Sequence, residues 1–319
     1  MAEIDLIERL DEAIAAILAG EARRDVAEPE LAMLALVAAD LRGLPDPQFK
    51  RELKGRILPM ATVTEVRIPE GLHTVTPYLA GEGATKLIDF LERAFDARVE
   101  ARHPRPDDPG KIMHSEIVIG DSRIELGDVS DVMDARRFEL HLYVEDADAV
   151  YAKAVAAGAR TLHAPMDQPY GDREAGIEDP MGNYWYIATH GKEIRPEGFR
   201  SITPFFHAKD AAEFIEFLKT AFGATEKELV MSPQGTVTYA TFLIGDSPIE
   251  LASAHGDWQP MPAAMHLFVS DADRVYQRAL DAGATTLFPP SDQPYGQRVG
   301  GVIDAEGNRW YIATPHSTP

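Results

Sequence analysis

The segment QPYGDREAGIEDPMGNYWYIAT, residues 168–189, returns as QPYGQRVGGVIDAEGNRWYIAT, residues 293–314. The second version begins 125 residues after the first (293 − 168 = 125), and the two align without a gap. The same spacing joins IGDSRIEL at 119–126 to IGDSPIEL at 244–251, and LHLYVEDAD to MHLFVSDAD. A repeat of this length indicates a duplicated domain, because the units of solenoids are shorter.

Composition excludes several classes of function. The chain has 319 residues, no cysteine and a formal net charge of -21. Without cysteine there are no disulfides, zinc–thiolate sites or cysteine nucleophiles. So acidic a surface repels phosphate backbones and anionic membranes, so we expect no nucleic-acid or membrane partner. The acidic start MAEIDLIERL is unlike a signal peptide, which predicts a cytoplasmic protein.

The first 62 residues differ from the repeat. Apolar residues at helical spacing predict a small helical segment, with stops at Gly20 and Gly43. We expect this segment, residues 1–62, to serve docking or dimerisation, through a homodimer contact or a protein partner. Two domains then follow, at residues 70–192 and 199–316.

Each copy has the pattern strand, helix, further strands, given twice. HTVTPYL alternates, with Val75 and Leu79 on one face, and ATKLIDFLERAF is an amphipathic helix. Asp146 and Asp271 precede helical runs and are predicted to cap them. Gly182 and Asn183 predict a tight turn before a strand on which Trp185 points away from its tyrosine neighbours.

Several of these motifs, in this order and twice, resemble the vicinal oxygen chelate superfamily. The resemblance is carried by VTPYL, FLERAF, MHSEIVIGDSRIEL, LYVEDADAVYAKAVAAGA and PYGDR…DPMGNYWYIAT, and is strongest to the PhnB-like branch. That superfamily includes glyoxalase I, extradiol dioxygenases and bleomycin-binding proteins. The resemblance implies an α+β fold: two tandem domains, each of two βαβββ modules that form a cup-shaped eight-stranded sheet. A cup can combine halves of one copy or of both copies.

The resemblance also implies where a metal would bind. Metal enzymes of this superfamily take His, Gln or Glu ligands from the first, fourth, fifth and eighth strands, which suits a divalent ion with open positions. In this chain these positions hold, one per copy, Thr76 and Thr203, Glu125 and Glu250, Glu139 and Ala264, and Tyr186 and Tyr311. Such a set predicts no resident cofactor, with a divalent metal as the alternative and Glu125, Glu139 and His141 as its candidate ligands.

If the chain is an enzyme, Glu125, Glu139 and His141 are the predicted catalytic residues. Glu139 gains a carboxylate neighbour in either arrangement of the halves, Glu125 within a copy or Glu250 across copies. Two close carboxylates raise each other's proton affinity and can serve as acid and base. His141 and His266 repeat each other, which suggests a shared packing or hydrogen-bonding role.

Further residues are predicted to line the cups and bind a ligand. Arg173 and Arg298 could clamp a carboxylate or phosphate, or pair with Glu178 or another acid in the same sheet. The other candidates are aromatic or titratable, and are Tyr78, His114, Tyr143, Tyr170, Tyr184, Tyr186, Glu250, His266, Tyr295 and Tyr311.

Three functions follow from these patterns. The first is a glyoxalase/bleomycin-resistance-like protein that binds a small organic ligand in an aromatic-lined cup without the full metal site. The second is a lyase, isomerase or epimerase of a small oxygenated substrate. The third is a scaffold whose N-terminal segment recruits a partner. Copy one, with His114, Glu116, Glu139 and His163, is expected to supply the polar, working cup.

Overall fold

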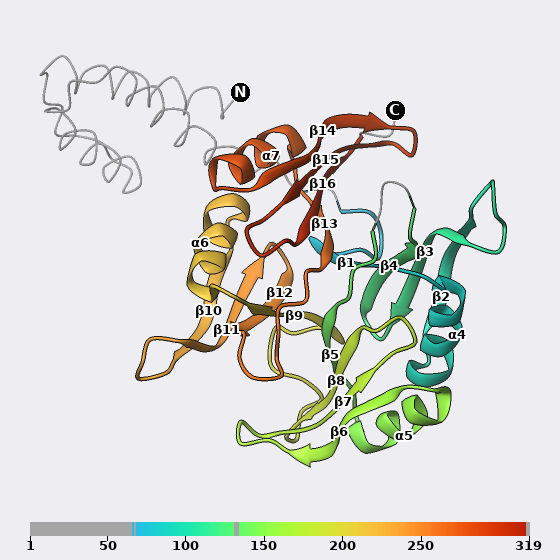
Figure 1. Ribbon diagram of the computed structural model, residues 1–319, viewed down its shortest axis with the longest axis vertical. Helices are drawn as coiled ribbons and strands as arrows, with labels where there is room; N and C mark the ends of the chain where they lie inside the picture. Colours follow the sequence, from blue (N-terminus) through green and yellow to red (C-terminus); the bar gives the residue numbers. More distant parts are fainter. Residues whose placement is uncertain (1–65, 67, 131–133, 317–319) are drawn as a thin grey trace, which may run out of the picture. The chain divides into compact units, whose positions relative to one another are not determined.

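The structure is a computed structural model that describes residues 66, 68–130 and 134–316, so the predicted helical segment at residues 1–62 lies outside it. The described part contains four βαβββ modules, two from each copy (Figure 1). In the first copy the elements are β1 (Val75–Gly81), α4 (Ala84–Phe95), β2 (Arg98–Pro104), β3 (Ile112–Ile119), β4 (Ser122–Asp128), β5 (Glu139–Tyr143), α5 (Ala147–Ala157), β6 (Arg160–Asp167), β7 (Asp172–Glu178) and β8 (Tyr184–His190). In the second copy they are β9 (Ile202–Ala208), α6 (Ala211–Phe222), β10 (Thr225–Met231), β11 (Val237–Ile244), β12 (Ser247–Ser253), β13 (Ala264–Phe268), α7 (Ala272–Asp281), β14 (Thr285–Gln293), β15 (Gln297–Ile303) and β16 (Arg309–Pro315).

These strands form two eight-stranded sheets, and each sheet takes one module from each copy. Sheet I has the order β14-β15-β16-β13-β1-β4-β3-β2, and sheet II has the order β10-β11-β12-β9-β5-β8-β7-β6. The modules join through antiparallel pairs, β1 with β13 and β5 with β9. The predicted fold class and eight-stranded sheets are therefore confirmed, and the open question of which halves pair is resolved in favour of exchange between copies.

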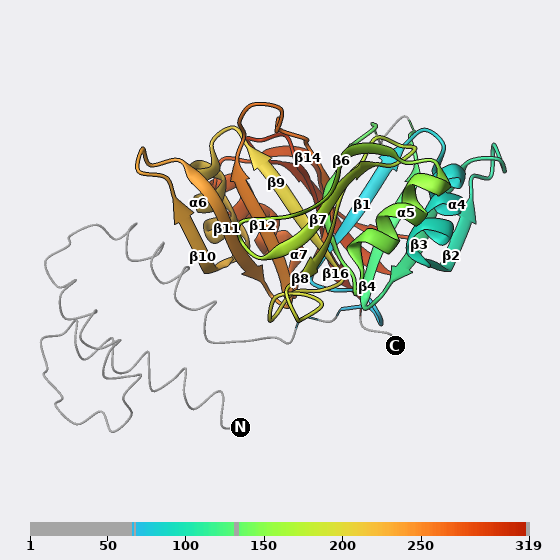
Figure 2. The same cartoon turned by 90° about the horizontal axis from the view of Figure 1, so that it is seen from below.

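Side-chain alternation gives each sheet a helix-facing side and an opposite side, which we call cup I on sheet I and cup II on sheet II. On the helix-facing side the apolar residues of both sheets merge into one core. Phe206 of sheet II stacks on Trp310 of sheet I at 6.5 Å between ring centroids, and Phe95 of α4 packs against Trp185 at 4.9 Å. Trp185 lies on this side and its tyrosine neighbours on the cup side, as the sequence predicted. Figure 2 shows α4 and α5 side by side beneath this arrangement.

The repeated turn before the last strand of each copy is a structural lock. Gly182 and Gly307 both have φ of 86°, a left-handed conformation that favours glycine. Asp179 accepts hydrogen bonds from Asn183 Nδ2 at 2.8 Å and from the buried Trp185 Nε1 at 2.9 Å. The second copy repeats these contacts with Asp304, Asn308 and Trp310. The motif D…GN.W is thus explained by folding, because it satisfies the buried indole and the turn together.

The helix caps follow the sequence prediction. Asp146 accepts a hydrogen bond from the backbone N–H of Ala149 at 2.9 Å, and Asp271 accepts one from Arg274 at 3.0 Å. Each therefore caps the helix of its second module, α5 and α7.

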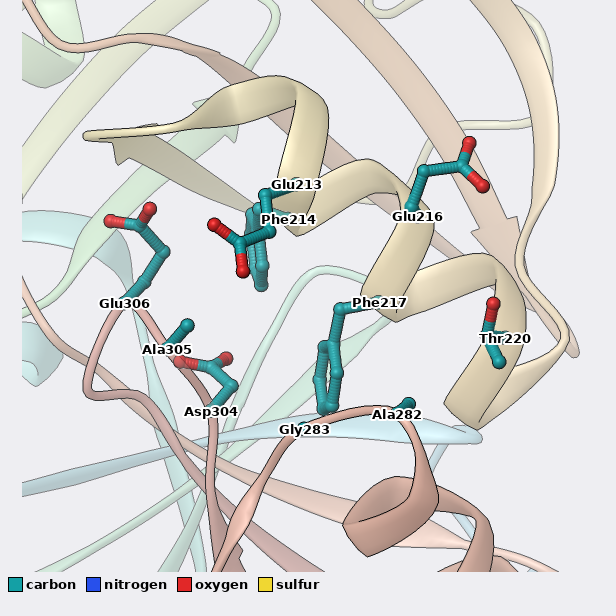
Figure 3. A pocket seen from close by; sticks show the side chains of 10 residues that line it. All are labelled: Glu213, Phe214, Glu216, Phe217, Thr220, Ala282, Gly283, Asp304, Ala305 and Glu306. Atoms are coloured by element: carbon teal, nitrogen blue, oxygen red, sulfur yellow. The ribbon is translucent and has the colours of Figure 1, made fainter.

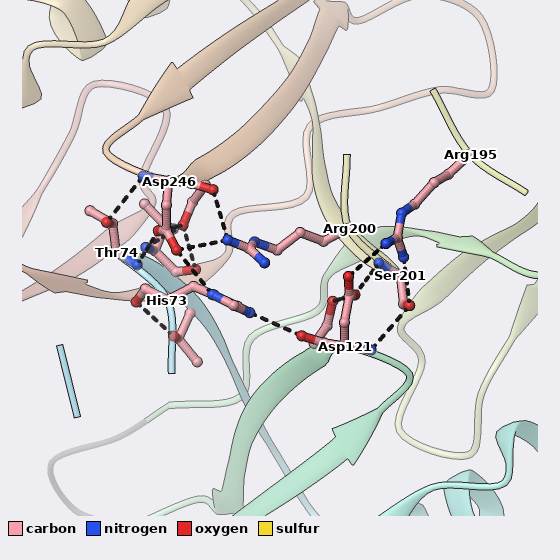
Figure 4. Close-up of polar contacts among 11 residues, drawn as sticks. His73, Thr74, Asp121, Arg195, Arg200, Ser201 and Asp246 are labelled. Carbon is pink, nitrogen blue, oxygen red and sulfur yellow. Dashed lines mark hydrogen bonds and ion pairs between the residues drawn. The ribbon is translucent and has the colours of Figure 1, made fainter. Parts of the chain in front are cut away.

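The repeated IGDS turns connect the two sheets (Figure 4). Asp246, in the turn between β11 and β12, accepts hydrogen bonds from the backbone N–H of Thr74 at 2.8 Å and from His73 Nδ1 at 3.1 Å. Asp121, in the matching turn of the first copy, accepts one from the backbone N–H of Ser201 at 2.8 Å. Each turn of one copy therefore holds the start of the first strand of the other copy.

We expect Asp246→Asn to lower the free energy of unfolding at neutral pH by about 1 kcal/mol, since it removes charge-assisted bonds from a carboxylate that is partly exposed and screened. Burial alone would raise the pKa of Asp246, but His73 and Thr74 hold it well below its usual range. A lowered folded-state pKa gives stability that is present above the unfolded pKa of about 3.9 and is lost as the pH falls through the folded value. The measurement is urea unfolding at pH 7 and pH 3.

The difference between wild type and variant should be smaller at pH 3 than at pH 7. Asp89→Asn on the exposed face of α4 is the matched control and should change neither value. A loss for Asp246→Asn that is equal at both pH values would contradict this account of the clasp.

Candidate functional site

The densest buried polar cluster of the described sheets lies in cup II. His141 of β5 donates from Nδ1 to Glu250 Oε2 of β12 at 2.7 Å and from Nε2 to Glu174 Oε2 of β7 at 3.1 Å. All three side chains are buried. Because Glu250 belongs to the other copy, this row of charges exists only in the exchanged arrangement of the sheets.

The imidazole of His141 is held in its charged form. Burial alone would lower its pKa, but the carboxylates of Glu250 and Glu174 outweigh burial and raise the pKa of His141 to about 10. Burial likewise acts to raise the pKa of Glu174, and the bond from His141 nevertheless lowers it. Tyr170 adds a hydrogen bond from its hydroxyl to Glu174 at 3.0 Å. The cluster is therefore a carboxylate–imidazolium–carboxylate row at neutral pH.

A second carboxylate–histidine pair lies beside this row. His207 of β9 donates from Nδ1 to Glu139 Oε2 at 2.8 Å, and the Tyr186 hydroxyl lies 3.4 Å from Glu139 Oε1. Again the two partners come from different copies, and both are buried. Cup II thus combines three carboxylates with two imidazoles.

Aromatic rings surround these charges. Phe205 and Tyr186 meet His141 edge-on at 5.6 and 5.5 Å between centroids, and Trp258 stacks on His207 at 5.6 Å. Tyr239 donates to the second oxygen of Glu250 at 2.7 Å. The polar groups therefore lie between aromatic walls supplied by β8, β9, β11 and the loop before β13.

Cup I repeats part of this arrangement. His266 of β13 donates from Nδ1 to Glu125 Oε2 of β4 at 2.9 Å, which matches the His141–Glu250 pair. The shared hydrogen-bonding role that the repeated histidines suggested is thus a bond to the glutamate of the other copy. Nε2 of His266, however, has no hydrogen-bond partner among the described residues. The residue that follows Arg298, Val299, occupies the position that Glu174 has in cup II.

The predicted catalytic residues do not share one cup. Glu139 and His141 lie in cup II, whereas Glu125 lies in cup I and contacts His266. The expectation that copy one supplies the polar, working cup is therefore wrong. The reason is the exchange of modules, which separates His114 and Glu116 of sheet I from Glu139 and His163 of sheet II.

The other predicted ligand-binding residues are also divided between the cups. Tyr78 and His114 lie in cup I with ring centroids 6.0 Å apart, and Tyr311 is 6.2 Å from Tyr78. Tyr143, Tyr184 and Tyr186 belong to strands β5 and β8 of sheet II. Tyr170 and Tyr295 are mostly exposed and occupy the same place between the last two strand pairs of each cup.

For the two arginines the structure shows the ion-pair alternative. Arg173 forms bonds from Nε and Nη2 to Asp148 of α5 at 2.6 and 2.7 Å, and a further bond to Asp167 of β6. Arg298 repeats this with Asp273 and Asp292. Both guanidinium groups therefore bind the helix side of their sheet and do not clamp a ligand in a cup.

Sequence reasoning missed Glu174, His207 and Trp258. Glu174 could have been found from strand alternation, because it follows Asp172 by two residues on a predicted strand. His207 lies on the same face of β9 as Thr203, the position that the resemblance singled out. Trp258 sits in a loop outside every repeated motif, so no periodic signal marks it.

The metal-binding positions implied by the resemblance do not fit a divalent ion. In cup II these positions hold Thr203 and Tyr186, and the carboxylates Glu139 and Glu250 each already accept hydrogen bonds from a histidine and a tyrosine. Nowhere in residues 66, 68–130 and 134–316 do three or more His, Asp or Glu side chains form a group that could hold a metal ion.

A cavity of about 170 Å³ lies outside both cups, between α6 and the turns before β14 and β16 (Figure 3). Phe214 and Phe217 of α6 line it together with Glu213, Glu216 and Glu306. The carboxylate of Glu306 is engaged by the backbone N–H groups of Lys209 and Asp210 at 2.8 and 2.9 Å.

The fold and the site agree with a family assignment. The family described as Glyoxalase/Bleomycin resistance protein/Dioxygenase superfamily matches residues 72–187 and 205–312, so the chain belongs to this superfamily. An uncharacterized protein of Mycobacterium bovis is 32% identical over 131 residues, covering 38% of this chain and 85% of that protein. One from Mycobacterium tuberculosis is also 32% identical, covering 38% and 76%.

Solved structures show the same fold. The crystal structure of glyoxalase I from Zea mays superposes with a TM-score of 0.59 at 13% sequence identity, covering 75% of this chain and 92% of that one. At this identity the likeness concerns the fold alone. Among the described helices, none combines the length and apolar character needed to cross a bilayer.

We expect His141 to remain protonated through neutral pH, with a midpoint near 10. Since the pKa is raised, its stabilising contribution is complete below the unfolded value of about 6.5 and is lost as the pH rises toward 10. Glu174→Val should lower the midpoint by about 1 unit or more, because one charged partner is removed. The measurement is a pH titration of the histidine ring signals by NMR.

Asp89→Asn, far from the cup and exposed, should leave that midpoint unchanged. A His141 midpoint below pH 7 in the wild-type protein would contradict the charged row.

Proposed function

We propose that this protein binds a small organic cation with an apolar body in cup II, and that it does so without a bound divalent metal. The observation that carries the proposal is the buried Glu250–His141–Glu174 row between aromatic walls. Buried charges cost desolvation energy and are concentrated at functional sites, which favours a binding role over a purely structural one.

The charge of cup II favours a cation. Three buried carboxylates, Glu139, Glu174 and Glu250, face two imidazoles, His141 and His207. Even with both imidazoles protonated, the cup keeps a net negative charge. A formal net charge of -21 on the whole chain would also draw cations toward the protein.

The aromatic walls favour an organic cation over an inorganic one. Rings of Trp258, Tyr186 and Phe205 lie 5.6–5.9 Å from one another or from the imidazoles. Such rings attract organic ammonium groups through cation–π interactions and pack against an apolar body. Trp258 and Tyr170 come from loops and lie at the edge of the charged row, so an entering ligand would displace these side chains before strand residues.

The metal-free part of the proposal rests on the donor set. Threonine and tyrosine occupy two of the four implied positions in cup II, and both carboxylates are already paired. Soft or borderline divalent ions prefer free imidazole and carboxylate ligands with open geometry.

We expect benzylammonium to bind more tightly than benzyl alcohol by a factor of about ten, since the buried carboxylates reward positive charge, and benzoate to bind least. The measurement is isothermal titration calorimetry, supported by quenching of Trp258. Trp185 and Trp310 are fully buried in the core, so a change in tryptophan fluorescence reports on Trp258.

Glu250→Gln should remove most of the preference for benzylammonium. Glu125→Gln, at the equivalent position of cup I, is the matched control and should leave it unchanged. Equal binding of benzylammonium and benzoate, or equal effects of both variants, would refute the assignment to cup II.

We also expect protein purified without a metal-affinity tag to contain far less than one nickel, manganese, iron or zinc per chain by elemental mass spectrometry. The reason is that the paired carboxylates leave too few free ligands. About one metal ion per chain that is lost in Glu139→Ala would overturn the metal-free proposal and favour a lyase or isomerase.

A further inference from the structure

The imidazole of His266 in cup I differs from every other buried histidine contact described above. Its Nδ1 is committed to Glu125 at 2.9 Å, but its Nε2 is buried and has no hydrogen-bond partner among the described residues. The side chain is only 13% exposed. A buried polar atom without a partner destabilises a fold, so its retention calls for an explanation.

Two substitutions between the copies produce this atom. In cup II, Glu174 accepts the Nε2 hydrogen bond of His141, and His163 lies 3.6 Å from the other oxygen of Glu174. In cup I the equivalent positions hold Val299 and Phe288. A polar pair has thus been replaced by an apolar pair at the same place, and the histidine above it has been kept.

The surroundings of Nε2 are apolar and aromatic. Phe268 stacks on the His266 ring at 4.6 Å, and Phe288 and Tyr311 stack on each other at 6.2 Å. Val299 and Phe268 belong to one buried cluster, against which the partly buried Phe288 and Tyr311 pack. The rings of Phe288 and Tyr311 therefore border both the apolar cluster and solvent.

The charged groups that face this part of cup I are few. Glu125 is bonded to His266, and His114 Nε2 lies 4.0 Å from Glu125 and 3.8 Å from Glu116. Glu116 is in turn paired with Arg123. Burial alone would raise the pKa of Glu125, but His266 and His114 lower it, so the carboxylate is ionised and Nδ1 is the donor. In the neutral ring Nε2 then carries the lone pair.

We propose that cup I is a second binding site, which takes flat, uncharged molecules whose O–H or N–H donates to Nε2 of His266. The Glu125–His266 pair fixes the ring and its tautomer, Val299 and Phe268 form the apolar floor, and the rings of Phe288 and Tyr311 border the entrance. The two cups would then select by opposite chemistry, cation in cup II and neutral donor in cup I. This site does not depend on the function proposed for cup II.

The test uses phenol as the donor probe and benzene as its counterpart without the hydroxyl. In protein labelled with ¹⁵N-histidine, phenol should shift the Nε2 resonance of His266 and leave the resonances of His141 in place. Phenol should bind at least about five times more tightly than benzene, the ratio expected for one hydrogen bond to an otherwise unpaired buried group.

Val299→Glu supplies the missing partner and should abolish the preference for phenol over benzene. If this variant does not fold, Val299→Gln makes the same test with a neutral partner. Glu174→Val, which alters only cup II, should leave the phenol shift at His266 intact.

Equal affinities for phenol and benzene, or a phenol shift confined to His141, would overturn the proposal. So would an unchanged phenol preference in the folded Val299 variant. Failure of benzylammonium to bind would bear on cup II alone, because none of these readouts depends on it.

Discussion

The antiparallel pairing of β1 with β13 and of β5 with β9 determines which side chains can meet in this protein. Through these two seams, each sheet joins a module of one copy to a module of the other. The seams place His141 against Glu250 and His266 against Glu125. The IGDS turns add bonds between the sheets, from Asp246 to Thr74 and from Asp121 to Ser201. The cups, the clasps and the shared core all follow from this exchange.

Exchange also explains how duplication produced two different sites from one framework. Each cup keeps the histidine–glutamate pair across its seam, because this pair satisfies buried polar atoms at the joint. Positions around the pair have diverged: Glu174 corresponds to Val299, His163 to Phe288, and His207 to Ala80. Each change moves cup II toward charge and cup I toward apolar surface. Divergence at a few positions around a constant joint is thus sufficient to give two chemistries.

Much of the fold could be predicted from the sequence because its signals are local. Strand alternation, the caps at Asp146 and Asp271, the turn at Gly182 and Asn183, and the burial of Trp185 depend on neighbouring residues. The pairing of modules could not be predicted, because repeated strands present nearly the same edges to a partner from either copy. That ambiguity misplaced Glu125 beside Glu139 and assigned the polar cup to copy one.

The site residues divide in the same way. Glu139, His141, Glu250 and His266 were found from motif positions, and their mutual contacts were not, since these join residues more than 100 positions apart for the two cross-copy pairs. His207 was missed because its counterpart in the first copy is Ala80, so the repeat gave it no emphasis. Trp258 belongs to a loop, where periodicity carries no information.

The most direct test of this account is a double-mutant cycle on the free energy of unfolding, with His141→Gln and Glu250→Gln as the two single changes. The exchanged sheets predict a coupling energy of about 1–3 kcal/mol between these residues. The same cycle with His141→Gln and Glu125→Gln, which lie in different cups, should give a coupling close to zero. Coupling of His141 to Glu125 and none to Glu250 would mean that each sheet forms within one copy, and would contradict the account.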